Sequence, residues 1–469
     1  MLTQVKRDLK NKFLHLFEEN KPTITDNDVE EVTRLREESI DRFRKIGFPS
    51  VKDESWKNTD LSKTLGRDLQ LHFTPEDEDV DIDKIFRCEV PELDTHIISL
   101  YNGWYIFRDS PLRTLPNGTM IGSFARAMKE MPDLLLDHFN KYASKAPDGL
   151  NALNTAFAQD GIFIYVPEGV EAYKPIQMIN VLNREDNLMI QNRNLIIMGK
   201  NSKLTFIHCD DSQNYRSSFT NTVTEVFMDE GSVVDHYKLQ NLNNDSSLIN
   251  STFFHQNEGS RLSSNLITLN GGLIRNDTHV TLNGKNCSAD IYGLYLVDKN
   301  QHVDNQVYIR HEKPMSLSNE LFKGILDDHS SGVFNGHIYV KKDAQKTNAF
   351  QTNRNILLTD KATVQSKPFL EIYADDVKCS HGATVGQLDN EAMFYIRSRG
   401  ISESNARLLL MYAFAAEIIG KISIQPLKER IDDLVKKRLR GELAICDQCV
   451  LHCHDQEKKY TFDIDVSKI

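Results

Sequence analysis

Four similar turns decide the fold of this chain: Gly199-Lys200-Asn201-Ser202, Asp229-Glu230-Gly231-Ser232, Asn257-Glu258-Gly259-Ser260 and Gly284-Lys285-Asn286-Cys287. Their second positions are residues 200, 230, 258 and 285, so the turns recur at steps of 30, 28 and 27 residues. A period of about 20–50 residues is typical of solenoid folds, in which each repeat stacks on its neighbours. The turns therefore predict a body of stacked coils.

Short runs rich in Val, Ile, Phe, Tyr and Thr lie between turns, such as residues 194–198, 222–227 and 337–340. These runs predict strands. No helix-length pattern separates them, which disfavours a sheet built from strand–helix–strand crossovers. A β-sandwich remains the alternative, because turn signals such as Asn270-Gly271-Gly272 also recur at shorter spacing. The one-coil recurrence of the turn chemistry favours a parallel β-helix.

The flanks of this body differ from it in texture. Residues 1–150 are mixed and largely helical, residues 151–385 carry the β-helix pattern, residues 386–445 are helical, and residues 446–469 form a tail with Cys and His. The fold class is therefore mainly β, with an N-terminal mixed cap and a C-terminal helical region. Leu9, Phe13, Leu14 and Phe17 follow helical spacing in the cap, and Trp56 is expected to anchor a polar loop to a core.

Composition excludes several function classes. The net charge is −11, from 56 basic and 67 acidic residues, which argues against a nucleic-acid partner and against binding to anionic membranes. No apolar run is long enough for a transmembrane helix, and the N-terminus has no secretory pattern. The seven cysteines are an odd number and four of them, Cys88, Cys209, Cys287 and Cys379, are widely scattered, which favours reduced thiols over a disulfide framework. We expect a cytoplasmic protein.

Common catalytic motifs are absent. The sequence has no phosphate-binding P-loop, no dinucleotide-binding glycine motif, no nucleophile elbow and no H-E-x-x-H metal motif. Two pairs of adjacent acids, Asp327-Asp328 and Asp375-Asp376, do not converge, since neighbours on a strand point to opposite faces. They are predicted to be turn or edge residues. The chain is therefore predicted not to be an enzyme.

One segment, Lys378-Cys379-Ser380-His381-Gly382, can bind metal. Cys379 and His381 are two residues apart, so an extended backbone points both side chains to the same face. Thiolate and imidazole suit iron or zinc, and Lys378 would lower the pKa of the thiol if its ammonium lay nearby. Two ligands are too few for a complete site, so a partner chain would supply the rest.

Two further segments are candidate sites. Ser402 to Arg440 predicts an amphipathic helix pair, whose apolar stripe includes Leu427, Ile431, Leu434 and Val435. This stripe either packs on its own domain or docks another protein. The tail concentrates five potential metal ligands within nine residues, which suits zinc or an iron–sulfur cluster. The five are Cys446, Cys449, His452, Cys453 and His454.

The segment from Tyr373 to Gly386, with its continuation Phe394 to Ile401, closely resembles the signature of SufD, a scaffold subunit of the SUF iron–sulfur cluster assembly system. The resemblance extends to Ser316–Gly324 and Phe350–Leu358. It is looser over residues 151–157 and 55–59. The Cys/His-rich tail has no counterpart in the family's shared pattern.

The resemblance implies a right-handed parallel β-helix that pairs with a SufB-like sister subunit and docks a SufC-like ABC-type ATPase through its C-terminal helices. It implies that His381 takes part in cluster assembly at the interface with the sister subunit, with Cys379 as the second candidate. ATP hydrolysis would belong to the partner. The cofactor would be a transient iron–sulfur cluster, or iron, shared between the subunits. Flavin binding by the complex stays open.

Two rival functions remain for a β-helix of this kind. One is a carbohydrate-active enzyme, which needs carboxylates that converge in a groove. The other is a homodimeric solenoid with a purely structural role. Whether the chain pairs with itself when a sister subunit is absent stays open.

Overall fold

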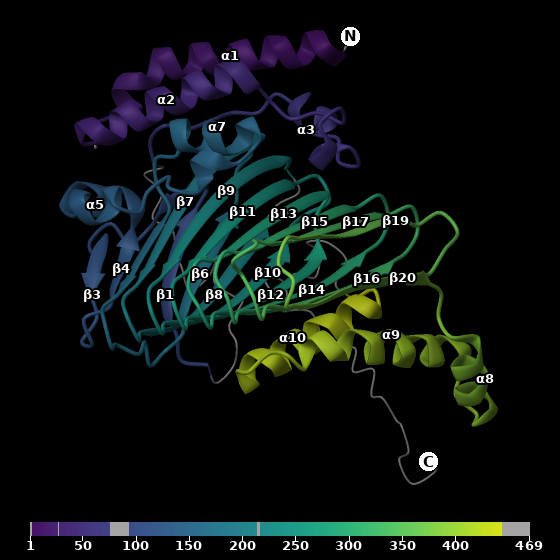
Figure 1. Cartoon of the computed structure of the whole chain (residues 1–469). Helices are drawn as coiled ribbons and strands as arrows, with labels where there is room; N and C mark the ends of the chain where they lie inside the picture. The colour runs from purple at the N-terminus through teal and green to yellow at the C-terminus, as the bar shows by residue number, and fades with distance from the viewer. Residues whose placement is uncertain (1, 27, 76–92, 213–215, 443–469) are drawn as a thin grey trace.

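The computed structural model describes residues 2–26, 28–75, 93–212 and 216–442. Its body is a stack of two-strand coils whose strands line up in two ten-stranded sheets (Figure 1). Consecutive long strands alternate between the sheets, and neighbouring long strands within a sheet are parallel. The parallel β-helix predicted from the turns is therefore confirmed, and the β-sandwich alternative is wrong.

The strands of the body are mostly ten residues long. Sheet B consists of β2 (Trp104–Tyr105), β1 (His96–Tyr101), β6 (Ile176–Leu182), β8 (Lys203–Ser212), β10 (Val233–Asn241), β12 (Arg261–Asn270), β14 (Ser288–Val297), β16 (Leu317–Leu326), β18 (Asn348–Leu357) and β20 (Lys378–Gly386). Sheet A consists of β19 (Thr363–Ile372), β17 (Ser331–Val340), β15 (His302–His311), β13 (Leu273–Leu282), β11 (Ser247–Gln256), β9 (Ser218–Met228), β7 (Leu188–Met198), β5 (Ile162–Val166), β4 (Met120–Ser123) and β3 (Leu112–Thr114).

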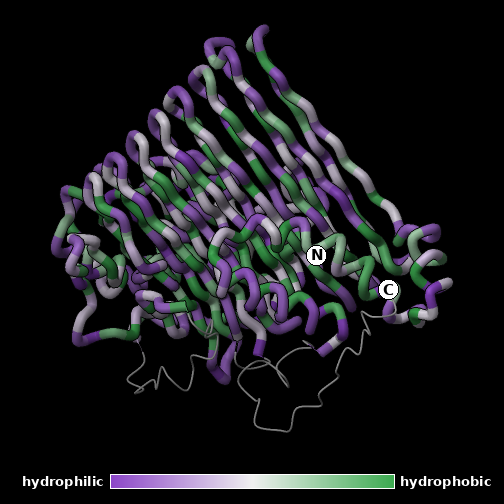
Figure 2. Tube along the Cα trace, turned by 90° about the horizontal axis from the view of Figure 1, so that it is seen from below, coloured by the Kyte–Doolittle hydropathy of each residue, from purple (hydrophilic) through white to green (hydrophobic). Residues whose placement is uncertain are grey.

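The four quoted turns stack directly on one another along one edge of the body. Asn201 N–H donates to Glu230 O at 2.8 Å, and Gly259 N–H donates to Lys285 O at 2.9 Å. The turns along the edges of the coils are mainly hydrophilic (Figure 2). A turn such as the one at residues 270–272 joins a strand of sheet B to the next strand of sheet A. Each coil therefore has two turns, which explains the shorter spacing that resembled a sandwich.

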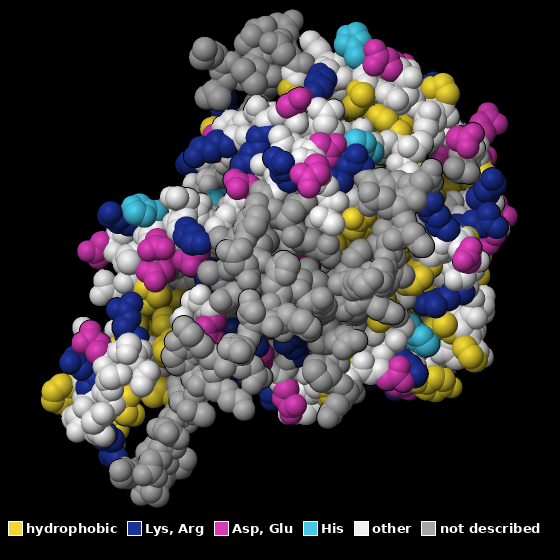
Figure 3. Space-filling model, turned by 180° about the vertical axis from the view of Figure 1, so that it is seen from behind, with side chains coloured by type: hydrophobic (Ala, Val, Ile, Leu, Met, Phe, Trp, Pro, Cys, Tyr) yellow, Lys and Arg dark blue, Asp and Glu magenta, His cyan; other side chains and the backbone are white. Residues whose placement is uncertain are grey.

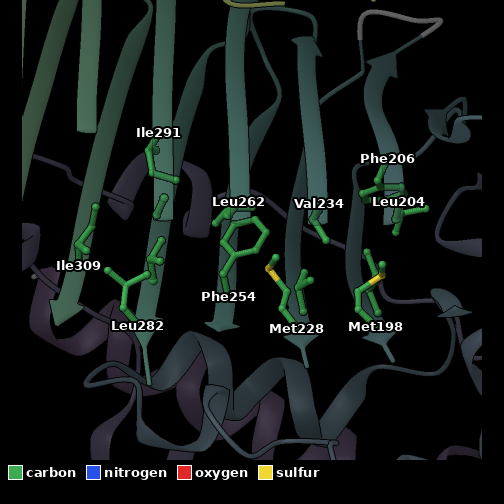
Figure 4. Packing of buried hydrophobic residues seen from close by; sticks show 14 of the residues in the cluster. Met198, Leu204, Phe206, Met228, Val234, Phe254, Leu262, Leu282, Ile291 and Ile309 are labelled. Atoms are coloured by element: carbon green, nitrogen blue, oxygen red, sulfur yellow. The ribbon is translucent and has the colours of Figure 1, made fainter. Parts of the chain in front are cut away.

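The core lies between the two sheets, because alternate residues of each strand point inward. Apolar side chains fill the inside of most coils, as Figure 4 shows for residues that include Met198, Phe206, Phe254 and Ile309. The inward positions combine Leu, Ile, Val, Phe and Met with buried polar side chains such as Asp210, Lys238 and Asn276. Burial of the apolar side chains is the main force that holds successive coils together.

Helices cover the outer face of each sheet (Figure 1). Sheet A carries the N-terminal set: α1 (Leu2–Ile24), α2 (Glu30–Ile46), α3 (Ser62–Leu65), α5 (Phe124–Glu130), α6 (Pro132–Leu136) and α7 (Gly149–Phe157), with short 3-10 turns at Glu54–Trp56 and Ala143–Lys145. Sheet B carries α9 (Glu403–Ile419) and α10 (Gln425–Leu439), and α8 (Asn390–Ser398) projects beside them. No helix among the described residues is long and apolar enough to cross a membrane.

Trp56 anchors the N-terminal cap to sheet A, as expected from the sequence. The indole is 1% exposed, and the guanidinium of Arg275 on β13 lies over its ring at 3.8 Å from the centroid. The indole N–H donates to Asp148 at 3.3 Å, and Arg275 also donates to the carbonyl of Ser55 at 2.6 Å. The loop around Trp56 is thus held by a buried stacking contact and by hydrogen bonds at both sides.

The two ends of the body differ. At the N-terminal end, antiparallel β3 and β4 and the helix α5 close sheet A. At the C-terminal end, β19 pairs only with β17 and β20 pairs only with β18 within the described part of the chain. The C-terminal end therefore presents the free edges of two parallel sheets side by side.

Candidate functional site

The candidate metal-binding segment is the last strand of sheet B. In β20, Cys379 is paired with Ala349 of β18 and His381 with Gln351. Ala349 and Gln351 are inward positions, at 0% and 1% exposure, and Cys379 packs against the interior core. Cys379 and His381 therefore both point to the inner side of the final coil, as the spacing of two residues predicted.

The free edge of β20 also carries the backbone of these two residues. Alternate residues of a parallel strand bond to opposite neighbours, and Lys378 N–H bonds to Thr347 O of the preceding coil at 2.9 Å. The backbone amides of Cys379, His381 and Ala383 consequently point away from β18. Side chains and backbone together make this edge a template for another strand.

Burial separates Cys379 from His381. Cys379 is half-buried and His381 is exposed. Burial raises the pKa of the Cys379 thiol, and hydrogen bonding with the backbone of Ala349 lowers it by less. The condition set for Lys378, an ammonium close to the thiol, is not met, because that side chain is on the outer face of the strand and exposed. In this chain alone, Cys379 is a thiol that ionises late, whereas His381 is accessible to a ligand.

Exposed apolar side chains surround the open end. Phe369, Ile372 and Tyr373 lie on or next to β19, and Val385 lies on β20; their exposed fractions are 38–55%. Large apolar side chains on the last coil, next to unpaired strand edges, are what a protein interface uses. The end of the solenoid therefore has the character of a docking surface.

The apolar stripe of α10 is part of the chain's own core, which revises the expected docking surface. Leu427, Ile431, Leu434 and Val435 are at most 4% exposed and pack with side chains of sheet B, such as Ile267. They are covered because α10 lies flat on the sheet, so their side chains are not available to an ATPase. Of the two readings that the sequence left open for these four residues, packing on the own domain is the observed one.

Helix α8 offers the exposed surface that α10 does not. None of its residues is buried, and Phe394 and Tyr395 are 73% and 59% exposed. In Figure 3, apolar side chains appear at the lower left, the corner to which α8 projects. The face seen there otherwise mixes acidic and basic side chains. Among the described residues of the C-terminal helices, the exposed large apolar side chains are therefore those of α8.

The tail ligands Cys446, Cys449, His452, Cys453 and His454 lie outside the described residues. Among residues that the structure describes, no group of three or more His, Cys, Asp or Glu side chains is arranged to hold a metal ion. Cys379 and His381 are two candidate ligands, which is fewer than a closed site needs. The adjacent acids at 327–328 and 375–376 lie in turns or bends, as predicted.

Sequence reasoning missed the polar layer directly behind β20. Glu320 and Gln351 occupy inward positions of β16 and β18, and both are buried. A charged residue at an inward position of an alternating strand was the available signal, but it does not distinguish this layer, because Asp210 and Lys238 are also buried at inward positions of β8 and β10. The segments that contain them, Ser316–Gly324 and Phe350–Leu358, were singled out only for their resemblance to a family.

Known protein families match nearly the whole chain. Residues 180–414 match the family model "SUF system FeS cluster assembly, SufBD core domain", and residues 7–178 match "SufBD protein N-terminal region". The core match takes in the strands from β7 to β20, α8 and most of α9. The final strand with Cys379 and His381 is therefore inside the matched core.

Curated relatives agree with these models. An iron–sulfur cluster assembly SufBD family protein of Synechocystis is 29% identical over 86% of this chain and 90% of its own length. The iron–sulfur cluster assembly protein SufD of Escherichia coli is 33% identical over 63% of this chain and 72% of its own length. A chloroplastic protein of Arabidopsis thaliana, ABCI7, is 29% identical over 86% of this chain and 85% of its own length.

Proposed function

Because the chain belongs to the SufBD family of iron–sulfur cluster assembly proteins, we propose that it is a non-catalytic scaffold subunit on which clusters are assembled. The observation that carries this proposal is the position of Cys379 and His381 at the open end of the solenoid. Both side chains face the inside of the last coil, and both backbone amides face its free edge. The cluster, or its iron, is the cargo of this site.

We propose that a SufB-like sister subunit completes the ligand set. A strand from the sister would pair with the free edge of β20 through the unused amides of Cys379, His381 and Ala383, and would cover the exposed apolar side chains of the last coil. Its own ligands would then lie beside His381. A site shared in this way forms only in the assembled complex, which suits a cluster that must later be released.

We propose that a SufC-like ABC-type ATPase docks on the C-terminal helices through α8, with Phe394 and Tyr395 as its apolar contacts. Motion of these helices would reach the site through β16. Lys323 of that strand pairs with Glu417 of α9 at 2.5 Å and donates to the carbonyl of Phe414 at 2.9 Å. ATP hydrolysis by the partner would thereby shift the last coils and expose or assemble the ligands around His381.

The central test replaces His381 by Ala in the complex with both partners. The side chain of His381 is exposed and is not part of the packed core in the described fold. We therefore expect the complex to form normally and cluster assembly to be lost. Size-exclusion chromatography checks the complex, and iron and sulfide analysis checks the cluster. Full cluster assembly by His381→Ala would contradict the proposal.

A second test addresses the edge. Ala383→Pro removes one backbone N–H that points to the free edge, without removing a bond to β18. We expect this variant to fold as the parent chain does and to lose its partner strand. Size-exclusion chromatography of the isolated chain tests whether two copies pair through this edge when the sister is absent. A parent homodimer that becomes monomeric in Ala383→Pro would pair through the edge of β20. A parent chain that is already monomeric would show that this edge does not pair two copies.

In this proposal, the chain is located in the same cellular compartment as its partner subunits. We keep the cytoplasmic expectation for the assembled complex, and the Arabidopsis relative carries a chloroplastic label in its name. Fractionation of cells with an antibody against this chain, alongside the ATPase partner, tests the expectation directly.

A further inference from the structure

A column of polar side chains runs inward from His381. Glu320 of β16, Gln351 of β18 and His381 of β20 occupy paired positions on three successive coils. Neighbouring strands of a sheet are about 4.8 Å apart, so side chains at paired inward positions lie next to one another. Glu320 and Gln351 are 0% and 1% exposed. The exposed imidazole therefore has a fully buried amide and carboxyl group directly behind it.

The side-chain amide of Gln351 makes a hydrogen bond through its nitrogen, and its oxygen is an unused acceptor. Its Nε2 donates to Glu320 Oε2 at 2.9 Å. Its Oε1 is buried and has no hydrogen-bond partner within the described part of the chain. Buried carbonyl oxygens are nearly always bonded. An unused acceptor beside a histidine at the paired position is thus an observation that needs an explanation.

The room for Gln351 is provided by the opposite sheet. Gly336 of β17 faces the amide, and a Cβ atom at that position would overlap Gln351 Nε2. The position behind Cys379 is different, because Ala349 has no polar side-chain atom. The polar support is therefore confined to His381, although both residues lie on the same face of the same strand.

Resting on the proposed function, we propose that Gln351, held in place by Glu320, is a positioning residue for His381. Gln351 Oε1 would accept the N–H of one imidazole nitrogen, which leaves the lone pair of the other nitrogen free for iron. Histidines that bind metals almost always donate their second ring N–H to such a partner, which fixes the tautomer and the orientation of the ring. Glu320 acts one step further back: by accepting from Nε2, it turns the carbonyl end of the amide toward β20.

The test measures the tautomer of His381 in the full isolated chain by 15N NMR of the imidazole, with the His381→Ala spectrum as the assignment. Gln351→Met keeps the length of the side chain and removes both polar atoms. We expect one dominant tautomer in the parent chain and a mixture in Gln351→Met. Gln365→Met, on the exposed outer face of β19, is the matched control and should leave the parent spectrum unchanged. An identical tautomer ratio in Gln351→Met and the parent would overturn the proposal.

Glu320 variants provide a second, independent arm. Glu320→Gln keeps an acceptor for Gln351 Nε2 and should preserve the tautomer, whereas Glu320→Met should disturb it as Gln351→Met does. If thermal unfolding shows that Gln351→Met is not folded, the Glu320 variants alone test the positioning role. Equal spectra for the two Glu320 variants would contradict the role given to the carboxyl group.

Cluster assembly in the complex separates this proposal from the proposed function. We expect Gln351→Met to reduce the yield or stability of the cluster by about 10-fold or more, the usual effect of removing a partner behind a metal ligand. If His381→Ala also assembles clusters normally, the proposed function fails. If His381→Ala is inactive and Gln351→Met is fully active with the parent tautomer, only the positioning role fails.

Discussion

At the scale of single residues, Cys379 and His381 differ mainly in the side chains of β18 that lie behind them. Cys379 and His381 share a face and a strand, yet one is backed by Ala349 and the other by Gln351. Apolar packing raises the pKa of the thiol, whereas the imidazole stays exposed and has a polar neighbour. The ranking of His381 ahead of Cys379, which rested on a family resemblance, thus gains a physical reason.

The buried carboxyl of Glu320 should make the stability of the fold depend on pH. Burial raises its pKa to about 8, and the hydrogen bond from Gln351 opposes this only in part. Between the pKa of the unfolded chain, near 4.5, and about 8, the unfolded state loses this proton while the folded state keeps it. Folding then binds a proton, so the contribution of Glu320 to stability falls as pH rises through that window.

Glu320→Gln removes this titration. We expect the variant and the parent to differ little near pH 4.5, and the variant to gain stability relative to the parent as pH rises to 8, by up to about 4 kcal/mol. Urea unfolding at several pH values measures the difference. A constant difference between pH 4.5 and 8 would contradict the raised pKa.

At the scale of elements, the turns do more than reverse the chain. Their backbones stack on the turns of the neighbouring coils through direct hydrogen bonds, so each turn must leave room for the next. Gly284 illustrates the constraint: a Cβ atom there would overlap the backbone of Asn257 and Glu258 in the preceding coil. Glycine at this position therefore serves the close approach of two coils.

Gly284→Ala should destabilise the fold by about 2–3 kcal/mol, because the backbone of the preceding turn cannot move aside without breaking its own hydrogen bonds. Gly259→Ala is the matched control in the adjacent turn. That residue has φ of +69°, and no atom lies closer than 4.0 Å to its Cβ position. Its cost should be the backbone strain alone, about 1 kcal/mol. Equal losses in chemical denaturation would show that steric contact between coils is unimportant.

The C-terminal helices show what apolar spacing in the sequence can and cannot predict about an element. The apolar spacing of residues 427–435 predicted an amphipathic helix, and α10 is one. The spacing alone left open whether the stripe packs on its own chain or on a partner. Arg438 helps to fix the answer, since it donates to Leu269 O and to Asp298, both at 2.7 Å, and ties the helix to sheet B.

At the scale of the whole molecule, the two sets of covering helices and the candidate site occupy different parts of the solenoid. The N-terminal cap covers sheet A, the helices α9 and α10 cover sheet B, and the open C-terminal end carries the candidate site (Figure 1). Each coil contacts mainly its neighbours, and the cap reaches the last coil of sheet A through Glu54, which pairs with Lys367 of β19 at 2.6 Å; this ion pair is exposed and therefore contributes little. The cap can therefore be loosened without direct damage to β20.

Trp56→Ala tests this separation. It removes a buried indole that covers Arg275, and we expect a loss of about 3–5 kcal/mol that is concentrated in the cap. Limited proteolysis should cut the loop around residues 57–68 faster, while labelling of Cys379 by a thiol reagent should stay at the parent rate. Lys57→Ala, at an exposed neighbouring position, should change neither. Faster labelling of Cys379 in Trp56→Ala would mean that the cap and the open end are coupled.

Local sequence patterns were sufficient to predict the architecture and the common face of the two candidate ligands. Recurring turns 27–30 residues apart specify a stack because each turn has the same local chemistry, and alternation along a strand places residues 379 and 381 on one face. These features depend on neighbours in the chain. The burial of the α10 stripe and the alignment of Glu320, Gln351 and His381 depend on contacts between residues about 30 or more positions apart. The packing of α10 on sheet B and the stacking of coils bring those residues together, and no local pattern contains that information.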